Sequence, residues 1–428
     1  MQLSVDPYKG TRDFYPEDMR VLKHMFGSIR HTVGLYGFEE YDSPLVEPTA
    51  LYAAKSGQEI VNEQTYSFTD RGGRDLTIRP EMTPSLARMV ARKQHELTFP
   101  LRWYSIPRLY RYERPQRGRL REHFQLNVDM FGVDSPTAEL ELISVGSQIL
   151  TDLGATQEDF VIKVNNRKLI NNIYEYLGLT EDQQYQASKL IDRLNKITPK
   201  EYQNEVKEII QNPEIEEKFV NLFTLRTWQE FIDIVPEELK NSEGAREMVE
   251  LFTKSEAQGI SNLVFDVTVM RGFDYYTGIV FEFFDTHPDN RRSMFGGGRY
   301  DDLVGMFDST QVSGCGFGMG DVILRDFLET HNLLPEFTPE AAILVTALDQ
   351  VAVPQAEALA GALRHKGQAV ILDISDTKPG AKFKFADKKG VETVYIIGEN
   401  ELAEGLVQVK NLTTGEQTSQ KLSDLQNT

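Results

Sequence analysis

The feature that most constrains the fold is a regular alternation of two hydrophobic patterns between residue 340 and the end of the chain. Short apolar runs, AAILVTAL, QAVILDI and VETVYIIG, alternate with two segments of helical spacing, over 353–366 and near 381–389. Strand, helix, strand, helix, strand is the pattern of an α/β unit with a mostly parallel sheet. We therefore expect an α/β domain over residues 340–428. The two prolines of HNLLPEFTP predict a linker over residues 331–339.

The preceding residues follow a pattern that is typical of an antiparallel sheet covered by helices. Apolar residues at helical spacing after Pro16 predict a long amphipathic helix over 17–36. A second helix is expected over 84–96. The expected strands are β-rich runs over 65–69, 75–79, 101–112 and 123–131, resumed by extended chain over 262–284 and glycine-rich stretches at 296–303 and 314–328.

Residues 168–258 interrupt this sheet pattern. They are rich in Glu, Lys, Leu and Ile at helical spacing, which predicts a mostly helical insertion. We therefore expect one sheet domain built from two parts, residues 1–167 and 259–330, with the insertion between them.

The composition restricts the classes of function. A formal net charge of −19 argues against a protein whose whole surface attracts nucleic acid. One basic island exists, residues 102–121, with seven arginines and a single glutamate. A single cysteine excludes an intramolecular disulfide, and neither a signal peptide nor a membrane-spanning run is visible, so we expect a cytosolic protein. The seven histidines have no metal-binding spacing, and the sequence identifies no metal ligands.

The basic island continues into a segment that reads as a strand, a turn-rich loop and a second strand, RLYRYERPQRGRLREHFQLNVDMFG at 108–132. A hairpin with Arg111 and Glu113 on one arm and Gln125 and Asp129 on the other would place cations and acceptors over one ligand. The planar fork of an arginine suits a phosphate, because it can bond two oxygens at once. A solvated charged hairpin would show the same density of arginine.

A second candidate cluster is VMRGFDYYTG at 269–278. Arg271 is flanked by apolar residues, so its charge should be drawn inward and should have an anionic partner. That partner could be a ligand, or it could be Asp274 in a purely structural ion pair.

The glycine-rich segments GGGRYD and GCGFGMG form the third cluster. Glycine lets a backbone approach a ligand or a neighbouring strand closely, but it also marks bulges and tight packing. Neither segment has the spacing of a phosphate-binding P-loop or of a dinucleotide-binding fold.

Taken together, these segments resemble the histidyl-tRNA synthetases, which are class II aminoacyl-tRNA synthetases, from about residue 7 to the end. KGTRDFYP at 9–16 and SPLVEP at 43–48 resemble the family's amino-terminal signature and motif 1, and IRPEMTPSLAR at 78–88 resembles its amino-acid-binding loop. Residues 108–132 resemble motif 2, and VMRGFDYYTGIVFE at 269–282 resembles the signature peculiar to the histidyl enzymes. The stretch KFKFADKKGVETVYIIGENELAEGLVQVKNLTTGEQ resembles the family's anticodon-binding domain.

This resemblance implies a fold, an activity and a set of site residues. The fold is an antiparallel sheet flanked by helices, with a helical insertion and a carboxy-terminal α/β domain. The activity is ATP-dependent activation of histidine, with Mg²⁺, followed by transfer to tRNA(His). The implied catalytic residues are Arg111 and Arg271. The implied histidine-binding residues are Glu81, Thr83, Gln125, Asp129, Arg271, Tyr275 and Tyr276. The implied ATP-binding residues are Arg111 at the α-phosphate, Glu113 near the adenine and Arg119 near the outer phosphates. The implied tRNA-binding residues are Arg114, Gln116, Arg117, Arg121, Lys382, Lys384, Lys388 and Lys389.

Two positions depart from the family's pattern. Asp129 stands where the family more often has glutamate, so the implied acceptor for the amino group of histidine is one methylene shorter. Ile323 stands where motif 3 usually has an arginine over the adenine, and Arg325 follows two residues later. On a helix that offset turns the side chain by roughly 200°, so Arg325 does not simply replace the missing arginine.

Two alternatives share the catalytic fold. The regulatory subunit of ATP phosphoribosyltransferase lacks the carboxy-terminal α/β domain and has an eroded histidyl signature, whereas this sequence has both. A class II synthetase for another amino acid would lack the histidyl signature. Motif 1 and the helix before it further imply a homodimer.

Overall fold

The structure is a computed structural model, which describes residues 3–53, 64–194, 197–270, 275–290, 292–307, 311–337 and 341–426. Arg271 and Asp274 lie outside the described residues. The chain forms two compact units that meet between Leu334 and Pro335, and each unit is described by itself.

The core of the first unit is a large sheet whose strands run in the order β1-β5-β7-β12-β11-β10-β8-β9, with β6 paired to β7. All of its neighbouring strands are antiparallel except the pairs β1/β5 and β8/β9. Its strands are β1 (Glu39–Glu40), β5 (Leu101–Ser105), β6 (Arg108–Tyr110), β7 (Glu122–Phe131), β8 (Phe160–Asn166), β9 (Leu263–Phe265), β10 (Ile279–Asp285), β11 (Ser293–Arg299) and β12 (Gly314–Gly320). The expected antiparallel sheet is therefore confirmed.

The expected strand over 101–112 is broken into β5 and β6. Pro107 lies at the break, where its ring nitrogen cannot donate to a sheet ladder. Its carbonyl instead accepts a hydrogen bond from Gln125 N at 3.1 Å. The arms of the expected hairpin are consequently short: β6 pairs with β7 only from Arg108 opposite Phe124 to Tyr110 opposite Glu122. Arg111 and Glu113 lie in the loop beyond β6.

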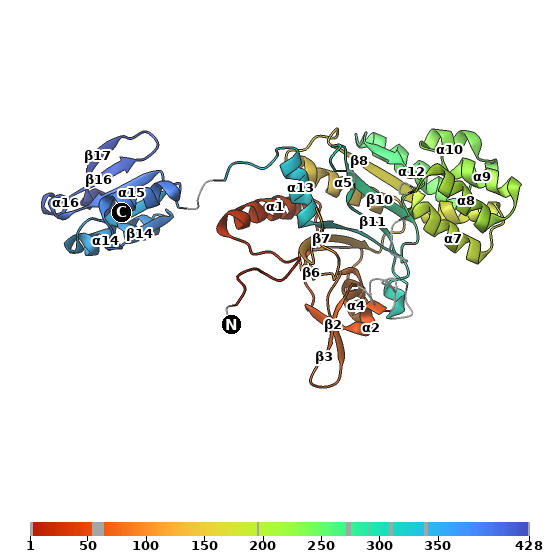
Figure 1. The fold of residues 1–428 in the computed structure, drawn as a ribbon, viewed down its shortest axis with the longest axis horizontal. Coiled ribbons are helices and arrows are strands. Elements are labelled where there is room, and N and C mark those ends of the chain that lie inside the picture. Colours follow the sequence, from red (N-terminus) through yellow and green to blue (C-terminus); the bar gives the residue numbers. More distant parts are fainter. Residues whose placement is uncertain are drawn as a thin grey trace. The chain divides into compact units, whose positions relative to one another are not determined.

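Three helices flank this sheet (Figure 1). They are α1 (Pro16–Leu35), α5 (Thr137–Asp152) and α13 (Asp321–Thr330). The observed α1 agrees within one residue with the helix expected over 17–36, and it packs against α5. Gly146 of α5 lies against the rings of Phe283 and Phe295, whose side chains share one face of the sheet. The opposite face is left for other groups, because side chains alternate along a strand.

A small sheet, β2-β4-β3, and two short helices follow α1 in the sequence. These elements are β2 (Val46–Pro48), β3 (Tyr66–Thr69), β4 (Asp75–Ile78), α2 (Thr49–Ala53) and α4 (Thr83–Lys93). The β3–β4 hairpin projects away from the large sheet in Figure 1. The helix expected over 84–96 ends three residues early, at Lys93.

The described part of the segment between β8 and β9 is mostly helical, as its composition predicts, and it lies to one side of the sheet (Figure 1). Its helices are α6 (Arg167–Tyr176), α7 (Glu181–Asp192), α8 (Pro199–Ile210), α9 (Pro213–Phe223), α10 (Trp228–Ile234), α11 (Glu237–Lys240) and α12 (Glu243–Ala257). Most of these helices are preceded by a residue whose side chain accepts a hydrogen bond from a backbone N–H of the first turn. Examples are Thr198 before α8 and Ser242 before α12.

The second unit has a five-stranded sheet in the order β14-β13-β15-β16-β17. Strands β13, β14 and β15 are parallel, as expected, whereas β16 and β17 add an antiparallel hairpin. The sheet is therefore mixed. Its elements are β13 (Ile343–Ala347), α14 (Val353–His365), β14 (Val370–Asp373), α15 (Pro379–Lys388), β15 (Thr393–Ile397), α16 (Glu399–Glu404), β16 (Leu406–Asn411), β17 (Gln417–Lys421) and α17 (Leu422–Gln426).

Candidate active site

The face of the large sheet opposite α5 carries a row of polar side chains from β7. Gln125 and Asp129 both lie on this face, because they are four positions apart on one strand and successive side chains alternate between the two faces. The neighbouring strand β12 presents glycines to them, with Gly316 opposite Asp129 and Gly318 opposite Asn127. A methyl group at Gly316 would overlap the Asp129 carboxylate, and one at Gly318 would lie 2.5 Å from Gln125 Nε2. The glycine-rich run therefore provides the space that these polar side chains occupy.

Asp129 is almost fully buried at the centre of this face. The Tyr300 hydroxyl, from the end of β11, donates a hydrogen bond to Asp129 Oδ1 across Gly316. The other oxygen, Oδ2, has no hydrogen-bond partner among the described residues. Burial raises the pKa of Asp129 to about 7, although the bond from Tyr300 acts in the opposite direction. Such a group gains strongly from a ligand that brings an N–H donor or a positive charge.

A second buried acid, Glu81, lies nearby in the segment before α4. The Tyr275 hydroxyl donates to Glu81 Oε2 at 3.3 Å and shares a side-chain hydrogen bond with Thr83, the first residue of α4. The Tyr275 ring centre lies 5.9 Å from that of Tyr300 and 5.0 Å from that of Tyr276. Burial holds the pKa of the Tyr275 and Tyr300 hydroxyls well above the ordinary tyrosine value, so both are neutral donors.

The structure thus brings most of the predicted histidine-binding residues into one neighbourhood. The described members of that set are Glu81, Thr83, Gln125, Asp129, Tyr275 and Tyr276. Tyr300 also lies in this neighbourhood, although it was not predicted from the sequence. The signal available was the glycine at 316, which lets a side chain cross between β11 and β7, but this signal is visible only once β12 is known to lie between those strands.

Arg111 lies at the edge of the same region, immediately after β6. Its Nε donates to Pro80 O at 2.9 Å, which ties it to the segment that carries Glu81. Within the part of the chain that the structure describes, its two terminal nitrogens have no partner. Burial and the positive charge of Arg111 together lower the pKa of His123 to about 3, so His123 is neutral and offers Arg111 no competing charge. The guanidinium is therefore available to an anionic ligand.

Residues 111–121 form the arginine loop. Beyond Arg111 this loop turns back on itself. Gln116 and Arg119 exchange backbone hydrogen bonds of 3.0 and 2.9 Å. Arg119 Nη1 lies 3.6 Å from Glu113 Oε2, so the two residues expected to contact ATP besides Arg111 are neighbours. Arg114 and Gln116 are exposed.

Two of the arginines expected to contact tRNA are engaged within the chain instead. Arg117 Nε lies 2.8 Å from Asp326 Oδ1 of α13. Arg121 donates from Nη1 to the Tyr8 hydroxyl at 2.7 Å, and its guanidinium lies 4.2 Å from the centre of the Tyr112 ring. Arg121 thus joins the amino-terminal segment to the arginine loop, whereas the expected role for it was contact with tRNA.

Ile323 and Arg325 settle the geometry of the motif 3 departure. A side chain at Gly118 would meet Ile323 Cδ1 at 2.8 Å, so Ile323 packs directly under the arginine loop. Arg325 turns the other way and pairs with Glu329 at 2.7 Å and with Asp18 of α1 at 3.1 Å. As the helical offset predicts, Arg325 does not take the place of the missing arginine.

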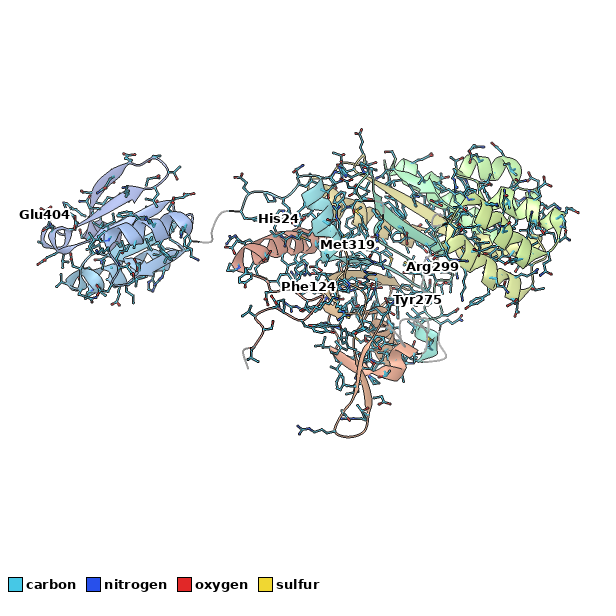
Figure 2. The ribbon with its side chains drawn as sticks, in the orientation of Figure 1. His24, Phe124, Tyr275, Arg299, Met319 and Glu404 are labelled. Carbon is cyan, nitrogen blue, oxygen red and sulfur yellow. The ribbon has the colours of Figure 1, made fainter. Side chains whose placement is uncertain are left out.

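A buried ion pair between Arg299 and Glu139 supports the Tyr300 side of the site and was also missed from the sequence. Arg299 bonds both carboxylate oxygens of Glu139, at 2.6 and 2.7 Å. It also contacts Asp301, whose carboxylate accepts from the Thr277 hydroxyl at 3.1 Å. Figure 2 shows Arg299 and Tyr275 close together on the side of the sheet towards the helical insertion. These contacts hold the chain next to Tyr276, through Thr277, and on either side of Tyr300, through Arg299 and Asp301.

In the second unit, the four lysines expected to contact tRNA differ in exposure. Lys384, Lys388 and Lys389 are exposed on and after α15. Lys382 is buried, and its ammonium contacts Asp373 Oδ2 at 3.1 Å and Ser375 O at 2.6 Å. The expectation that Lys382 attracts tRNA phosphates is therefore wrong, because its ammonium is buried and paired with Asp373 inside the unit.

Comparison with known families tests the resemblance directly. Residues 10–320 match the family model described as histidyl-tRNA synthetase. The chain belongs to the histidyl-tRNA synthetase family. Residues 341–428 match a second family model, described as an anticodon binding domain.

Relatives in the histidyl-tRNA synthetase family are similar over the full chain. A histidine--tRNA ligase of Leptospira biflexa is 42% identical over 99% of this chain and 97% of its own length. The chloroplastic/mitochondrial histidine--tRNA ligase of Arabidopsis thaliana is 38% identical over 99% of this chain and 87% of its own.

Solved structures of the family share the fold. The histidyl-tRNA synthetase from Nostoc sp. PCC 7120 superposes with a TM-score of 0.81, at 25% identity over 99% of this chain and 98% of that one. A Bacillus halodurans protein described as an ATP phosphoribosyltransferase regulatory subunit/histidyl-tRNA synthetase has a TM-score of 0.76 at 24% identity, over 93% and 99% of the two chains. At that identity the second likeness shows the fold alone.

Proposed function

We propose that this chain activates histidine with ATP and transfers the histidyl group to tRNA(His). It is an aminoacyl-tRNA ligase of the kind named in its relatives. The observation that carries the proposal is the buried cluster of Asp129, Tyr300, Glu81 and Tyr275 beside Arg111, whose terminal nitrogens have no partner among the described residues. The regulatory-subunit alternative is disfavoured, because the relatives that match the full chain are named histidine--tRNA ligase and residues 341–428 match an anticodon binding domain.

The histidine pocket is proposed to hold the amino acid by its polar ends. Asp129 is buried, its Oδ2 has no partner among the described residues, and the ring of its partner Tyr300 packs against that of Tyr275. We propose that this apolar surrounding favours the imidazole N–H as the ligand of Asp129 over the amino group. Glu81, Thr83 and Gln125 are then left for the amino group. Tyr275, Tyr276 and Tyr300 enclose the ring, and Arg271 is proposed at the carboxylate.

Activation is proposed to proceed by in-line displacement. An oxygen of the histidine carboxylate forms a bond to the α-phosphorus of ATP, and the bond to the bridging oxygen breaks, releasing pyrophosphate. Arg111 and Arg271 neutralise charge on the transferring group, so catalysis is positional and electrostatic. In the second step a terminal ribose hydroxyl of the tRNA attacks the activated carbonyl, and AMP leaves.

ATP is proposed to lie over the arginine loop, with Glu113 near the adenine and Arg119 near the outer phosphates. No group of three or more acidic, histidine or cysteine side chains in the described residues could hold a metal ion. We propose Mg²⁺ as a part of the nucleotide substrate, bound chiefly by its phosphates and water.

The tRNA contacts are proposed for exposed residues of both units. At the acceptor end these are Arg114 and Gln116, with Arg117 and Arg121 only if they exchange their present partners. At the anticodon stem these are Lys384, Lys388 and Lys389, whose charges would attract phosphates. Residues 1–167 with 259–330 are proposed as the catalytic domain, 168–258 as its insertion, 331–339 as a linker and 340–428 as the anticodon-binding domain.

We further propose a homodimer that works in the cytoplasm. The apolar side chains Leu45 and Val46, in the motif 1 segment, are exposed, as a subunit interface would require. No helix in the described ranges is long and apolar enough to cross a bilayer. Sedimentation of the purified chain tests the dimer.

The experiment that tests the overall function is charging of tRNA. The full chain, supplied with ATP, Mg²⁺ and labelled histidine, should transfer label to tRNA(His) and not to tRNAs for other amino acids. Absence of labelled tRNA from protein that is folded and binds ATP would overturn the proposal.

A further inference from the structure

The junction between β8 and α6, residues 165–168, lies between the sheet and the helical insertion. Asn165 is fully buried within it. Its side-chain amide donates to Val267 O at 3.0 Å and to Val269 O at 3.2 Å, and its Oδ1 accepts from Asn166 N at 2.8 Å. Asn165 therefore fixes the backbone that leads into the histidyl signature.

Arg167 holds the same signature at two further points. Its guanidinium Nη1 donates to Met270 O at 3.3 Å, and its backbone N–H donates to Gly278 O at 2.9 Å. Met270 and Gly278 stand on either side of the sequence that contains Arg271, Tyr275 and Tyr276. One residue of the junction thus bonds the chain both before and after the proposed catalytic segment.

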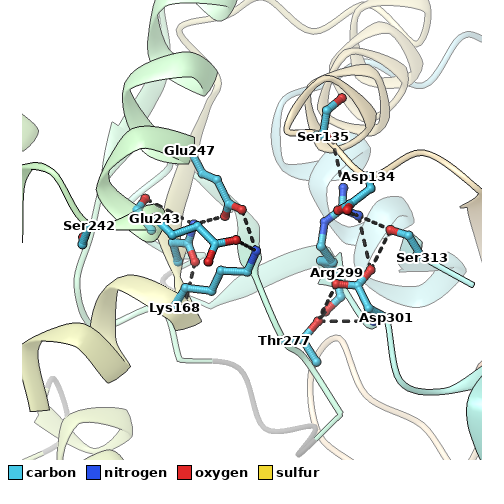
Figure 3. A network of polar contacts seen from close by, with 12 residues as sticks. Asp134, Ser135, Lys168, Ser242, Glu243, Glu247, Thr277, Arg299, Asp301 and Ser313 are labelled. Carbon is cyan, nitrogen blue, oxygen red and sulfur yellow. Dashed lines mark hydrogen bonds and ion pairs between the residues drawn. The ribbon is translucent and has the colours of Figure 1, made fainter. Parts of the chain in front are cut away.

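The other side of the junction is bonded to the last helix of the insertion. Asn166 Nδ2 donates to Glu247 Oε2 at 2.6 Å. Lys168 Nζ lies 2.6 Å from Glu243 Oε1 and 2.7 Å from Glu247 Oε1, as the left part of Figure 3 shows. Gly244 brings α12 against α6 so closely that a side chain there would overlap the backbone of Leu169. Docking of α12 and placement of the signature therefore depend on four consecutive residues.

We propose that Asn165 and Arg167 are positioning residues for histidine activation, and that Glu247 of α12 acts on them through its bonds to the neighbouring Asn166 and Lys168. The junction transmits the seating of the helical insertion to the segment that carries Arg271. The inference rests on the proposed function for its effect on rate. Its structural part, that Arg167 and Glu247 hold the signature in place, does not.

Arg167→Met tests this with little risk to folding, because Arg167 is half-buried and the backbone bond to Gly278 survives. Loss of the bond to Met270 should lower the rate of histidine-dependent pyrophosphate exchange about 10-fold, with the KM for ATP unchanged. Arg167→Lys, which keeps the charge and one donor, should recover part of the loss. Glu247→Gln should lower the rate about 3-fold through the insertion side.

Glu205→Gln is the matched control, because it breaks the 2.5 Å ion pair with Arg193 inside the insertion without touching the junction. It should leave the exchange rate unchanged. Amide hydrogen exchange over residues 267–280 should accelerate about 10-fold in Arg167→Met and Glu247→Gln, but not in Glu205→Gln.

Unchanged protection of residues 267–280 in Arg167→Met would overturn the proposal, and so would an equal loss of rate in Glu205→Gln and Glu247→Gln. If the wild-type chain showed no histidine-dependent exchange, the proposed function would fall. The protection pattern would still decide whether the junction holds the signature.

Discussion

The carboxylate of Asp129 lies where its charge is poorly solvated. Its pKa of about 7 means that the folded protein binds a proton there in a pH range where the unfolded chain, with an ordinary aspartate pKa near 4, has released it. The free energy of unfolding should therefore fall as the pH rises from about 4 to 7 through this group. Stability is given up at this position to keep an acceptor ready for a ligand.

Asp129→Asn should consequently stabilise the protein without ligand while weakening histidine binding. At pH 8 we expect a gain in the free energy of unfolding on the order of 2–4 kcal/mol, because the buried charge is removed and the acceptor for Tyr300 is retained. Urea denaturation at pH 5 and pH 8 measures this, and the gain should be smaller at pH 5. An equal gain at both pH values would show that the pKa of Asp129 is not raised in the folded state.

Arg111 and Arg325 provide a comparison between an arginine proposed to contact ATP and an arginine that is paired with Asp18 and Glu329. Arg111→Ala should reduce the rate of adenylate formation by about 10²–10³-fold, the usual cost of losing one preorganised donor. Arg325→Ala should change the rate and the KM for ATP less than about 2-fold, because its ion pairs to Asp18 and Glu329 are partly exposed. A large effect of Arg325→Ala on the KM for ATP would reassign it to the nucleotide site.

At the scale of elements, the sequence predicted what periodicity and punctuation encode. The helix over 17–36, the helical insertion and the alternating α/β pattern are all visible as repeats of apolar residues, and each is present. The break at Pro107 and the short β6–β7 pairing were not anticipated, since they depend on which strand the chain meets. The inward turn of Lys382 was missed for a similar reason: Asp373 comes from a neighbouring strand, not from the lysine's own helix.

The strand order β7-β12-β11 is the part of the site that no local pattern reveals. Asp129 and Tyr300 meet only because β12, which comes last of the three in the sequence, lies between the other two. The role of the glycines of GCGFGMG depends on that order, because it places Gly316 between Asp129 and Tyr300.

Gly316→Ala tests whether β12 must leave space for the hydrogen bond between Asp129 and Tyr300. The added methyl group would lie between Asp129 and the Tyr300 hydroxyl, so the KM for histidine should rise at least about 10-fold, with a cost in stability of about 1–3 kcal/mol. Gly27→Ala in α1 is the matched control, because nothing lies within 4 Å of its added methyl group, and it should leave the KM unchanged. A normal KM in Gly316→Ala would show that histidine does not depend on this hydrogen bond.

In the whole molecule, the boundary between Leu334 and Pro335 separates the proposed activation of histidine from the proposed binding of the anticodon stem. Every residue proposed to touch histidine or ATP lies in the first unit. Deleting residues 335–428 should therefore leave the activation rate within about 3-fold of the full chain, since each unit has its own core. Charging of tRNA should weaken much more, as measured by the KM for tRNA(His). Loss of activation in a folded truncated chain would contradict this division.

Amino-acid-dependent exchange of labelled pyrophosphate into ATP decides whether the first unit activates histidine. The exchange rate of the full chain with Mg²⁺ is measured with each of the twenty amino acids in turn. We expect exchange with histidine and only background exchange with the other nineteen. Exchange with a different amino acid, or none with histidine in folded protein, would contradict this expectation.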